Sequence, residues 1–185
     1  MKALSDSYYH LYNRGNNKEL IFFEDQNYVF FLLQFKKHVS PFCNVYAYCL
    51  MPNHFHFFVR INDELLFEKG IKNFFISYTK AINKRYDRVG SLFQGRYKVS
   101  EITSDSYFTT IINYIHQNPV IAALVANMED YKYSSYPAYL SNKETNLKKQ
   151  EVLDWFGGLE SFIEHHKMSL DEKEISRRLK LWVRC

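Results

Sequence analysis

The sequence predicts an α+β fold of the ferredoxin-like, split βαβ type, in which an antiparallel sheet carries two helices on one face. Three observations support this fold class. Predicted elements follow in the order strand, helix, strand, strand, helix, strand, with further helices after them. Both long predicted helices have an apolar side at helical spacing, as a helix packed on a sheet requires. The chain has 185 residues and is 46% hydrophobic, which suits one domain with a real core.

The chain opens with a strand and a helix. Residues 8–12 are largely aromatic and suit a strand, and the Asn- and Gly-rich residues 13–18 form a tight loop after it. Asp25 can cap a helix that extends to about His38 and ends before Pro41. Its apolar stripe comprises Tyr28, Phe31, Leu32 and Phe35.

A hairpin follows, and the rest of the chain is organised around it. A strand at residues 45–51 leads to a turn at Pro52 and Asn53, because proline cannot donate to a sheet ladder and asparagine favours turns. In the next strand the side chains alternate between faces, so His54 and His56 share one face. The opposite face carries Phe55, Phe57 and Val59.

The second repeat adds a helix at about residues 65–86, with Gly70 as a candidate interruption. Its apolar side comprises Ile71, Phe74, Phe75, Tyr78 and Ile82. Residues 92–99 then form a loop that enters a fourth strand, which ends near Thr103.

A third helix is predicted from Ser104, a candidate N-cap, to Asn118. Pro119 closes it, because the residue before a proline avoids the α region. Tyr114 and Asn118 lie one turn apart on the same face of this helix. Beyond it we expect a short apolar helix at residues 120–126, irregular structure at 131–140 and a polar linker at 141–146. Two or three short helices should follow, around residues 151–156, 159–166 and 169–182.

The composition restricts the cellular compartment and the kinds of binding partner that we expect for this protein. No run is apolar and long enough to span a membrane, and the N-terminus lacks an apolar signal segment, so we expect a cytoplasmic protein. The three cysteines have no C-x-x-C spacing, which fits reduced thiols. A net charge of +4 permits an anionic partner without proving one. Aromatic residues make up 18% of the chain, and a minority of them could stack on nucleic-acid bases.

Two histidines on one strand face can share a metal ion, since histidine is the commonest metal ligand. His54 and His56 are separated by Phe55, which would anchor the strand from the other face. The pair is a weak signal on its own, because two ordinary strand histidines give the same pattern. Ligand chemistry alone also leaves the metal open, since imidazole suits Zn²⁺ as well as other ions.

Four ordered motifs resemble the single-tyrosine HUH transposases, the insertion-sequence-200-like family. They are YHLYNRGNN at residues 9–17, AYCLMPNHFH at 47–56, FQGRY at 93–97 and YIHQNPV at 114–120. The REP-associated tyrosine transposases of this family are similar also at residues 130–136, DYKYSSY. The resemblance covers about residues 7–140. It divides the chain into a transposase-like catalytic domain, residues 1–140, and a helical extension packed on it, residues 141–185.

The resemblance implies a metal-dependent enzyme that cuts and rejoins single-stranded DNA beside a hairpin. His54 and His56 correspond to the metal-binding pair, Tyr114 to the nucleophile that forms a 5′-phosphotyrosine, and Asn118 to the residue that completes the metal site. The implied metal is Mg²⁺ or Mn²⁺. Asn118 favours the REP-associated branch, because other members often carry Gln there. The family includes dimers with shared active sites and members that act as monomers, so monomer and homodimer both remain open.

The residues suit this chemistry on physical grounds. Two imidazoles and one amide oxygen would hold a divalent ion with positions left for phosphate oxygens. Tyrosine, with a pKa of about 10, is a weak nucleophile, and polarisation of the phosphate with good alignment would compensate. A phosphotyrosine ester conserves the bond energy, so no ATP is needed. Taken alone, Tyr114 could equally be a packed helix tyrosine and Asn118 a helix cap.

Basic residues in or near the motifs are candidates for binding DNA phosphates: Arg14, Lys18, Arg96 and Lys98. Four more could extend the patch, Lys80, Lys84, Arg85 and Arg88, and each of the eight could also be a solvated charge. Glu24, Asp25 and His10 are candidates for groups that support the site. His116 points off the helix face of Tyr114 and is left out.

Three functions remain open at the level of sequence. The first is a metal-dependent DNA strand transferase. The second is a domesticated protein that binds DNA hairpins without cutting them. The third is a metal-dependent phosphoesterase that uses water, with Tyr114 only structural. The presence of all four chemical residues, Tyr114, His54, His56 and Asn118, favours the first.

Overall fold

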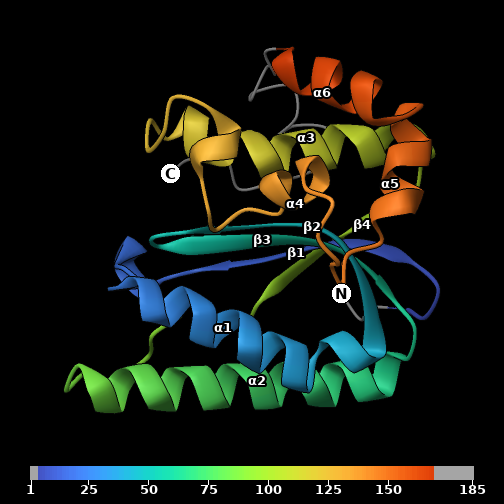
Figure 1. Cartoon of the computed structure of the whole chain (residues 1–185). Helices are drawn as coiled ribbons and strands as arrows, with labels where there is room; N and C mark the ends of the chain where they lie inside the picture. Colours follow the sequence, from blue (N-terminus) through green and yellow to red (C-terminus); the bar gives the residue numbers. More distant parts are fainter. Residues whose placement is uncertain (1–3, 169–185) are drawn as a thin grey trace.

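The computed structural model describes residues 4–168, which form a four-stranded antiparallel sheet between two layers of helices (Figure 1). The strands are β1 (Tyr8–Arg14), β2 (Cys43–Met51), β3 (His54–Ile61) and β4 (Lys98–Ile102), in the order β2-β3-β1-β4. Two long helices, α1 (Asp25–His38) and α2 (Glu64–Arg85), cover one face. The predicted ferredoxin-like class is therefore confirmed. The helix predicted at 169–182 lies outside the described residues.

The layer of α1 and α2 holds one hydrophobic core. The predicted stripe of α1 is buried at Tyr28, Phe31 and Phe35, and the ring of Phe35 stacks on Phe57 of β3 at 4.2 Å between centroids. The predicted interruption at Gly70 is wrong, because α2 continues through it. A Cβ at Gly70 would lie 2.1 Å from the carbonyl oxygen of His38, so this glycine lets the end of α1 approach α2 closely.

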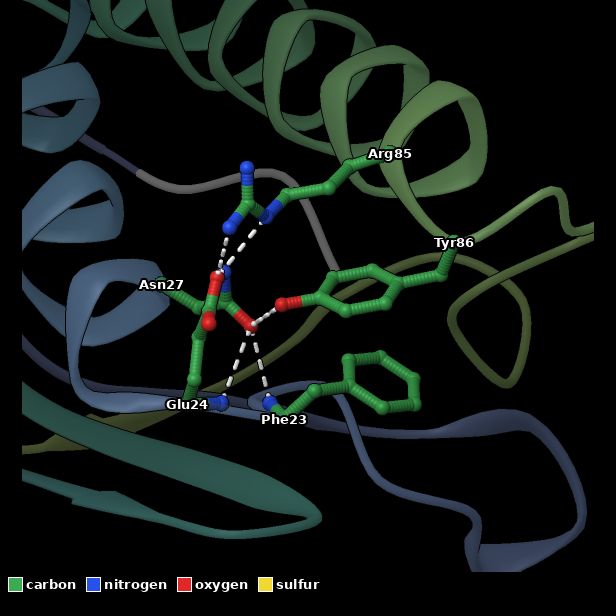
Figure 2. Close-up of polar contacts among 5 residues, drawn as sticks. All are labelled: Phe23, Glu24, Asn27, Arg85 and Tyr86. Carbon is green, nitrogen blue, oxygen red and sulfur yellow. Dashed lines mark hydrogen bonds and ion pairs between the residues drawn. The ribbon is translucent and has the colours of Figure 1, made fainter.

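The start of α1 is tied to the end of α2 by a polar cluster (Figure 2). Asn27 Oδ1 accepts hydrogen bonds from the backbone N–H groups of Phe23 and Glu24, at 2.8 and 3.3 Å, and from the hydroxyl of Tyr86 at 3.0 Å. Glu24 pairs with Arg85 at 2.6 Å. The orphan N–H groups at this helix end are thus satisfied by a capping box, which is the role the structure gives Glu24.

The other face of the sheet carries α3 (Asp105–Ile121), α4 (Tyr136–Leu140), α5 (Lys149–Phe156) and α6 (Leu159–Lys167) (Figure 1). Short 3₁₀ turns lie at Asn16–Lys18, Ser40–Phe42 and Met128–Asp130. A second core joins β2, β3 and α3 to α5 and α6, with Phe58, Ile112, Ile115, Val152 and Phe162 fully buried. Helices α5 and α6 therefore share a core with the helix that bears Tyr114.

Between residues 104 and 140 the structure differs from the sequence prediction in three places. α3 does not end at Asn118 but continues through Pro119 to Ile121. Proline removes only one hydrogen-bond donor, and the N–H of Ala122 beyond it still donates to the Asn118 carbonyl at 2.9 Å. The helix predicted at residues 120–126 does not form, because Ala123 adopts a positive φ of 53°. Within residues 131–140, predicted as irregular, α4 forms a short helix.

The sequence led us to expect reduced cysteines and no membrane-spanning segment, and both expectations can be compared with the structure of residues 4–168. Cys43 and Cys49 are buried, and neither forms a disulfide within residues 4–168. Within residues 4–168, no helix combines the length and the apolar character that crossing a membrane requires.

Candidate active site

The two histidines of the hairpin lie side by side on the sheet face that α3 covers. β1 and β3 pair antiparallel, which sets Tyr12 opposite His56 and Arg14 opposite His54. The imidazole rings of His54 and His56 are 5.0 Å apart between centroids and nearly perpendicular. Phe55 and Phe57 are buried in the core on the other face. The predicted alternation of this strand is confirmed.

The turn before β3 orients the imidazole of His54. Its Nδ1 lies 2.6 Å from Asn53 Oδ1, while Asn53 Nδ2 donates to the carbonyl of Lys18 at 3.2 Å. An amide oxygen can only accept, so the proton of neutral His54 is on Nδ1. Nε2 then carries the lone pair, and neutral imidazole with such a lone pair is the form that binds a metal ion.

A third histidine, His10 of β1, supports His56. His10 Nε2 and His56 Nδ1 are 2.8 Å apart, and both side chains are buried. If His56 donates in this bond, its own Nε2 keeps a lone pair. His10 Nδ1 is buried without a hydrogen-bond partner among the described residues, which costs about 1–3 kcal/mol for such a group. His10 and Asp25 were both candidates for supporting the site. His10 contacts His56 directly, whereas Asp25 pairs with Lys132 on the α1 side.

Burial keeps all three imidazoles neutral. It lowers the pKa of His10 to about 3 and the pKa of His56 well below the ordinary value. For His54, burial lowers the pKa to about 4, a hydrogen bond with Asn118 opposes the shift, and the charge of Arg14 adds to it. Neutral imidazole is the form that binds a metal ion, so no proton has to be removed near pH 7.

Helix α3 brings Tyr114 and Asn118 to these histidines. The ring of Tyr114 lies edge-on to His56, with centroids 5.6 Å apart, and its side chain is only 4% exposed. Asn118 hydrogen-bonds with His54 and also donates Nδ2 to the Tyr114 carbonyl at 2.7 Å. The structure therefore gathers all four residues predicted for the chemistry, from two elements that are remote in sequence.

The donor set of two imidazoles and one amide oxygen could hold a divalent ion, and it does not by itself decide which one. Among residues 4–168, no three His, Cys, Asp or Glu side chains gather where they could hold a metal ion. Any metal site here would therefore need the amide oxygen of Asn118 beside His54 and His56. Such a set would leave positions for water or phosphate oxygens.

Three of the four predicted DNA-binding residues surround the His54 end of the sheet. Arg14, at the end of β1, donates Nε to Gln94 Oε1. Burial and the nearby charge of Arg14 lower the pKa of Lys98, which begins β4. Lys18 is exposed, and its carbonyl is bound by Asn53. Arg96 differs, because its guanidinium lies 3.5 Å from a Glu68 oxygen on α2.

Sequence reasoning missed the contacts of two residues, Tyr12 beside the site and His116 on the opposite side of α3. The ring of Tyr12 stacks on His10 at 4.7 Å, and strand alternation could have placed it there, since it lies two residues after His10. His116 is fully buried and hydrogen-bonded to Ser135 and His166. No local pattern signals that contact. Of the possible patch extensions, Arg85 and Arg88 pair with Glu24 and Glu19 on the α1 side.

Comparison with known proteins adds three findings. A family model described as IS200-like transposase matches residues 3–118, which include the histidine hairpin, Tyr114 and Asn118. The solved structure of a REP-associated tyrosine transposase bound to a REP hairpin is similar in fold, with a TM-score of 0.62 and 15% sequence identity. The similarity covers 75% of this chain and 82% of that one. A search of curated proteins found no match.

Proposed function

This chain belongs to the IS200-like transposase family, and from that premise we propose that it is a metal-dependent single-stranded DNA endonuclease and strand transferase of the REP-associated type. One observation carries the proposal: Tyr114, His54, His56 and Asn118 lie together within a single chain. A tyrosine beside neutral imidazoles and an amide is the arrangement that phosphoryl transfer to a tyrosine requires.

Tyr114 is the proposed nucleophile. Its hydroxyl oxygen bonds to the phosphorus of a backbone phosphate, and the bond from phosphorus to the 3′ oxygen breaks. The phenol proton passes to solvent, and the departing 3′ oxygen takes up a proton. The products are a 5′-phosphotyrosine and a free 3′-hydroxyl. Attack by a 3′-hydroxyl on this ester reverses the step and joins strands without ATP.

His54 and His56 through Nε2, and Asn118 through Oδ1, are the proposed ligands of a Mg²⁺ or Mn²⁺ ion. When bound, the ion supplies Lewis-acid polarisation of the scissile phosphate. Asn53 holds the proton of His54 on Nδ1, and His10 orients His56 in the same sense. Because Tyr114 and Asn118 are one turn apart on α3, backbone hydrogen bonds fix the nucleophile relative to a ligand.

The proposed substrate is single-stranded DNA that carries a hairpin. Arg14, Lys18 and Lys98 would contact backbone phosphates near His54, and Arg96 would extend the contact around the sheet edge toward α2. The similar transposase was solved with a REP hairpin, which supports a hairpin partner here. We further propose a cytoplasmic protein whose residues 1–140 are the catalytic unit and whose residues 141–185 extend it. Monomer and homodimer remain alternatives.

Trapping a covalent complex tests this function. The protein is incubated with a panel of single-stranded hairpin oligonucleotides, with and without Mn²⁺, and separated under denaturing conditions. A Mn²⁺-dependent protein–DNA adduct is expected with hairpin strands and not with unstructured strands of equal composition. Binding without any cleavage would favour a domesticated hairpin-binding protein. Cleavage without an adduct would favour a phosphoesterase that uses water.

A further inference from the structure

The side of α3 that faces away from the sheet histidines carries a buried polar chain that the proposed function does not use. His116 Nδ1 lies 2.9 Å from His166 Nε2 of α6, and His116 Nε2 lies 2.7 Å from Ser135 Oγ. His166 Nδ1 lies 2.7 Å from the Phe162 carbonyl, and Ser135 Oγ is 2.9 Å from the backbone N–H of Tyr48 in β2. This chain of hydrogen bonds therefore links the sheet, α3 and α6.

With both imidazoles neutral, one arrangement of protons satisfies these four bonds. The Phe162 carbonyl can only accept, so His166 is protonated on Nδ1 and accepts at Nε2. His116 then donates from Nδ1 and accepts at Nε2 from the Ser135 hydroxyl. Ser135 in turn accepts the N–H of Tyr48. Both imidazoles are neutral, which agrees with the direction in which burial shifts their pKa values, downward.

A serine bonded to a histidine and a second polar group could suggest a hydrolytic triad, but the burial of Ser135 excludes that role. Ser135, His116 and His166 are 0%, 0% and 1% exposed. The Ser135 oxygen also lies 3.2 Å from the Tyr48 carbonyl, so protein groups surround it. No substrate can reach this hydroxyl, so the role of this hydrogen-bond chain must lie within the protein.

Two further side chains of α3 bind the end of α6. Gln117 Nε2 donates to the carbonyls of His166 and Met168, at 2.9 and 2.8 Å. Asn113 Nδ2 donates to the His165 carbonyl at 3.0 Å. The last carbonyl oxygens of a helix have no partner within it, and here α3 supplies those partners. Asn113, His116 and Gln117 thus form one continuous polar contact with α6.

We propose that α6 acts as a clamp on α3: its contacts fix the rotation of α3 about the helix axis and the height of α3 above the sheet. His116 and His166 are then positioning residues for Tyr114 and Asn118. The inference rests on the proposed function of Tyr114. Hydrogen bonds are directional, whereas apolar packing alone permits helices to slide and rotate. Rotation of α3 that carried Tyr114 away from His56 would break the bonds of His116. A nucleophile misplaced by about 1 Å can lose about a hundredfold in rate.

Two variants of His166 distinguish a role in positioning α3 from a contribution to the stability of the fold alone. His166→Leu removes the acceptor for His116, and His166→Gln restores an amide acceptor and donor on a side chain of similar reach. Hydrogen exchange is measured on peptides of α3, and the single-turnover rate of adduct formation is measured at saturating hairpin DNA with Mn²⁺. Phe31→Leu, in the core of the α1 side, is the matched control for general destabilisation.

We expect His166→Leu to raise exchange in α3 about tenfold or more, and to lower the adduct rate by a similar factor, at unchanged DNA affinity. His166→Gln should recover most of both, and Phe31→Leu should leave α3 exchange and the adduct rate near those of the native chain. Ser135→Ala breaks this series of hydrogen bonds at its other end. It replaces the leucine variant if that variant does not fold.

Exchange in α3 that stays at the native level in His166→Leu, or in its Ser135→Ala replacement, would overturn the clamp. An equal loss of adduct rate in Phe31→Leu would overturn it as well. If the native chain forms no adduct at Tyr114, the proposed function fails instead, and the exchange rates still decide whether α6 holds α3.

Discussion

His10 Nε2 lies 2.8 Å from His56 Nδ1, in a hydrogen bond between two buried imidazoles of neighbouring strands. A metal-ligating histidine usually donates its other ring N–H to a carboxylate, a carbonyl or water. In the proposed metal site a neutral imidazole, that of His10, takes that place, and it adds no negative charge. His54 is held differently, by the Asn53 amide oxygen. When His56 donates to His10, both histidines carry their lone pair on Nε2.

The contact between His10 and His56 predicts a loss of metal affinity when His10 is replaced. His10→Phe keeps a ring that can stack on Tyr12 but removes the acceptor for His56. Mn²⁺ affinity, measured by calorimetry, should fall about 10- to 100-fold while the protein stays folded. His38→Gln, on the α1 side, is the control and should bind Mn²⁺ normally. Native affinity in His10→Phe would show that His10 does not orient a ligand.

The paired histidines predict a metal site that is lost without loss of the fold. The double variant His54→Ala with His56→Ala should show no Mn²⁺ binding by calorimetry and no cleavage. His54 is only half-buried, so its removal alone should change the melting temperature little. Removal of the buried His56 leaves His10 without its partner and should lower the melting temperature while the chain stays folded at room temperature. Circular dichroism verifies the fold of the variant. Metal binding of native strength in this variant would place the ion elsewhere.

The basic residues around His54 predict DNA binding that weakens steeply with salt. Arg14→Ala should lower the affinity for hairpin-bearing single strands and reduce the slope of log affinity against log salt by about 0.7, as one phosphate contact is lost. Arg85→Ala, an exposed cation paired with Glu24 beside α1, is the matched control and should leave that slope unchanged (Figure 2). A native slope in Arg14→Ala would contradict the phosphate contact.

The buried histidine of α6 predicts that stability falls in mild acid. Burial lowers the pKa of His166 to about 4, the Phe162 carbonyl opposes this shift, and His165 adds to it. The pKa in the unfolded chain is about 6.5. The unfolded state therefore binds more protons between pH 6.5 and 4, and stability decreases as the pH falls through this window. His166 can contribute up to about 3 kcal/mol of that loss.

Urea unfolding of the native chain and of His166→Gln measures this contribution. His116 faces His166 from α3 and is present in both proteins, as are the other buried histidines. The stability advantage of the native chain at pH 7 should therefore shrink toward pH 4. An advantage that is constant with pH would mean that His166 does not titrate on unfolding in this range.

The parts of the site that could be predicted from the sequence are those set by local rules. Alternation along a strand and the turn at Pro52 and Asn53 place His54 and His56 on one face, and helical periodicity stacks Tyr114 on Asn118. Element order was sufficient for the sheet and its two covering helices. The roles of these four residues in metal binding and catalysis stay predictions.

The parts that could not be predicted depend on partners far along the chain. His116 meets His166 fifty residues later, and His10 meets His56 across neighbouring strands. The continuation of α3 through Pro119 likewise depends on its surroundings, because packing against β2, α5 and α6 holds the helix where local propensity would end it. A single sequence contains no local signal for any of these contacts.

The most direct test of the central claim is peptide mass spectrometry of the native protein after reaction with a cleavable hairpin-bearing single strand and Mn²⁺. The account predicts one nucleotide adduct, on Tyr114, and none in Tyr114→Phe, which should still bind DNA and metal. Tyr12→Phe is the matched control, because it removes the hydroxyl of a second ring beside the same histidines. An adduct on Tyr12 or any other tyrosine, or full cleavage by Tyr114→Phe, would contradict the account.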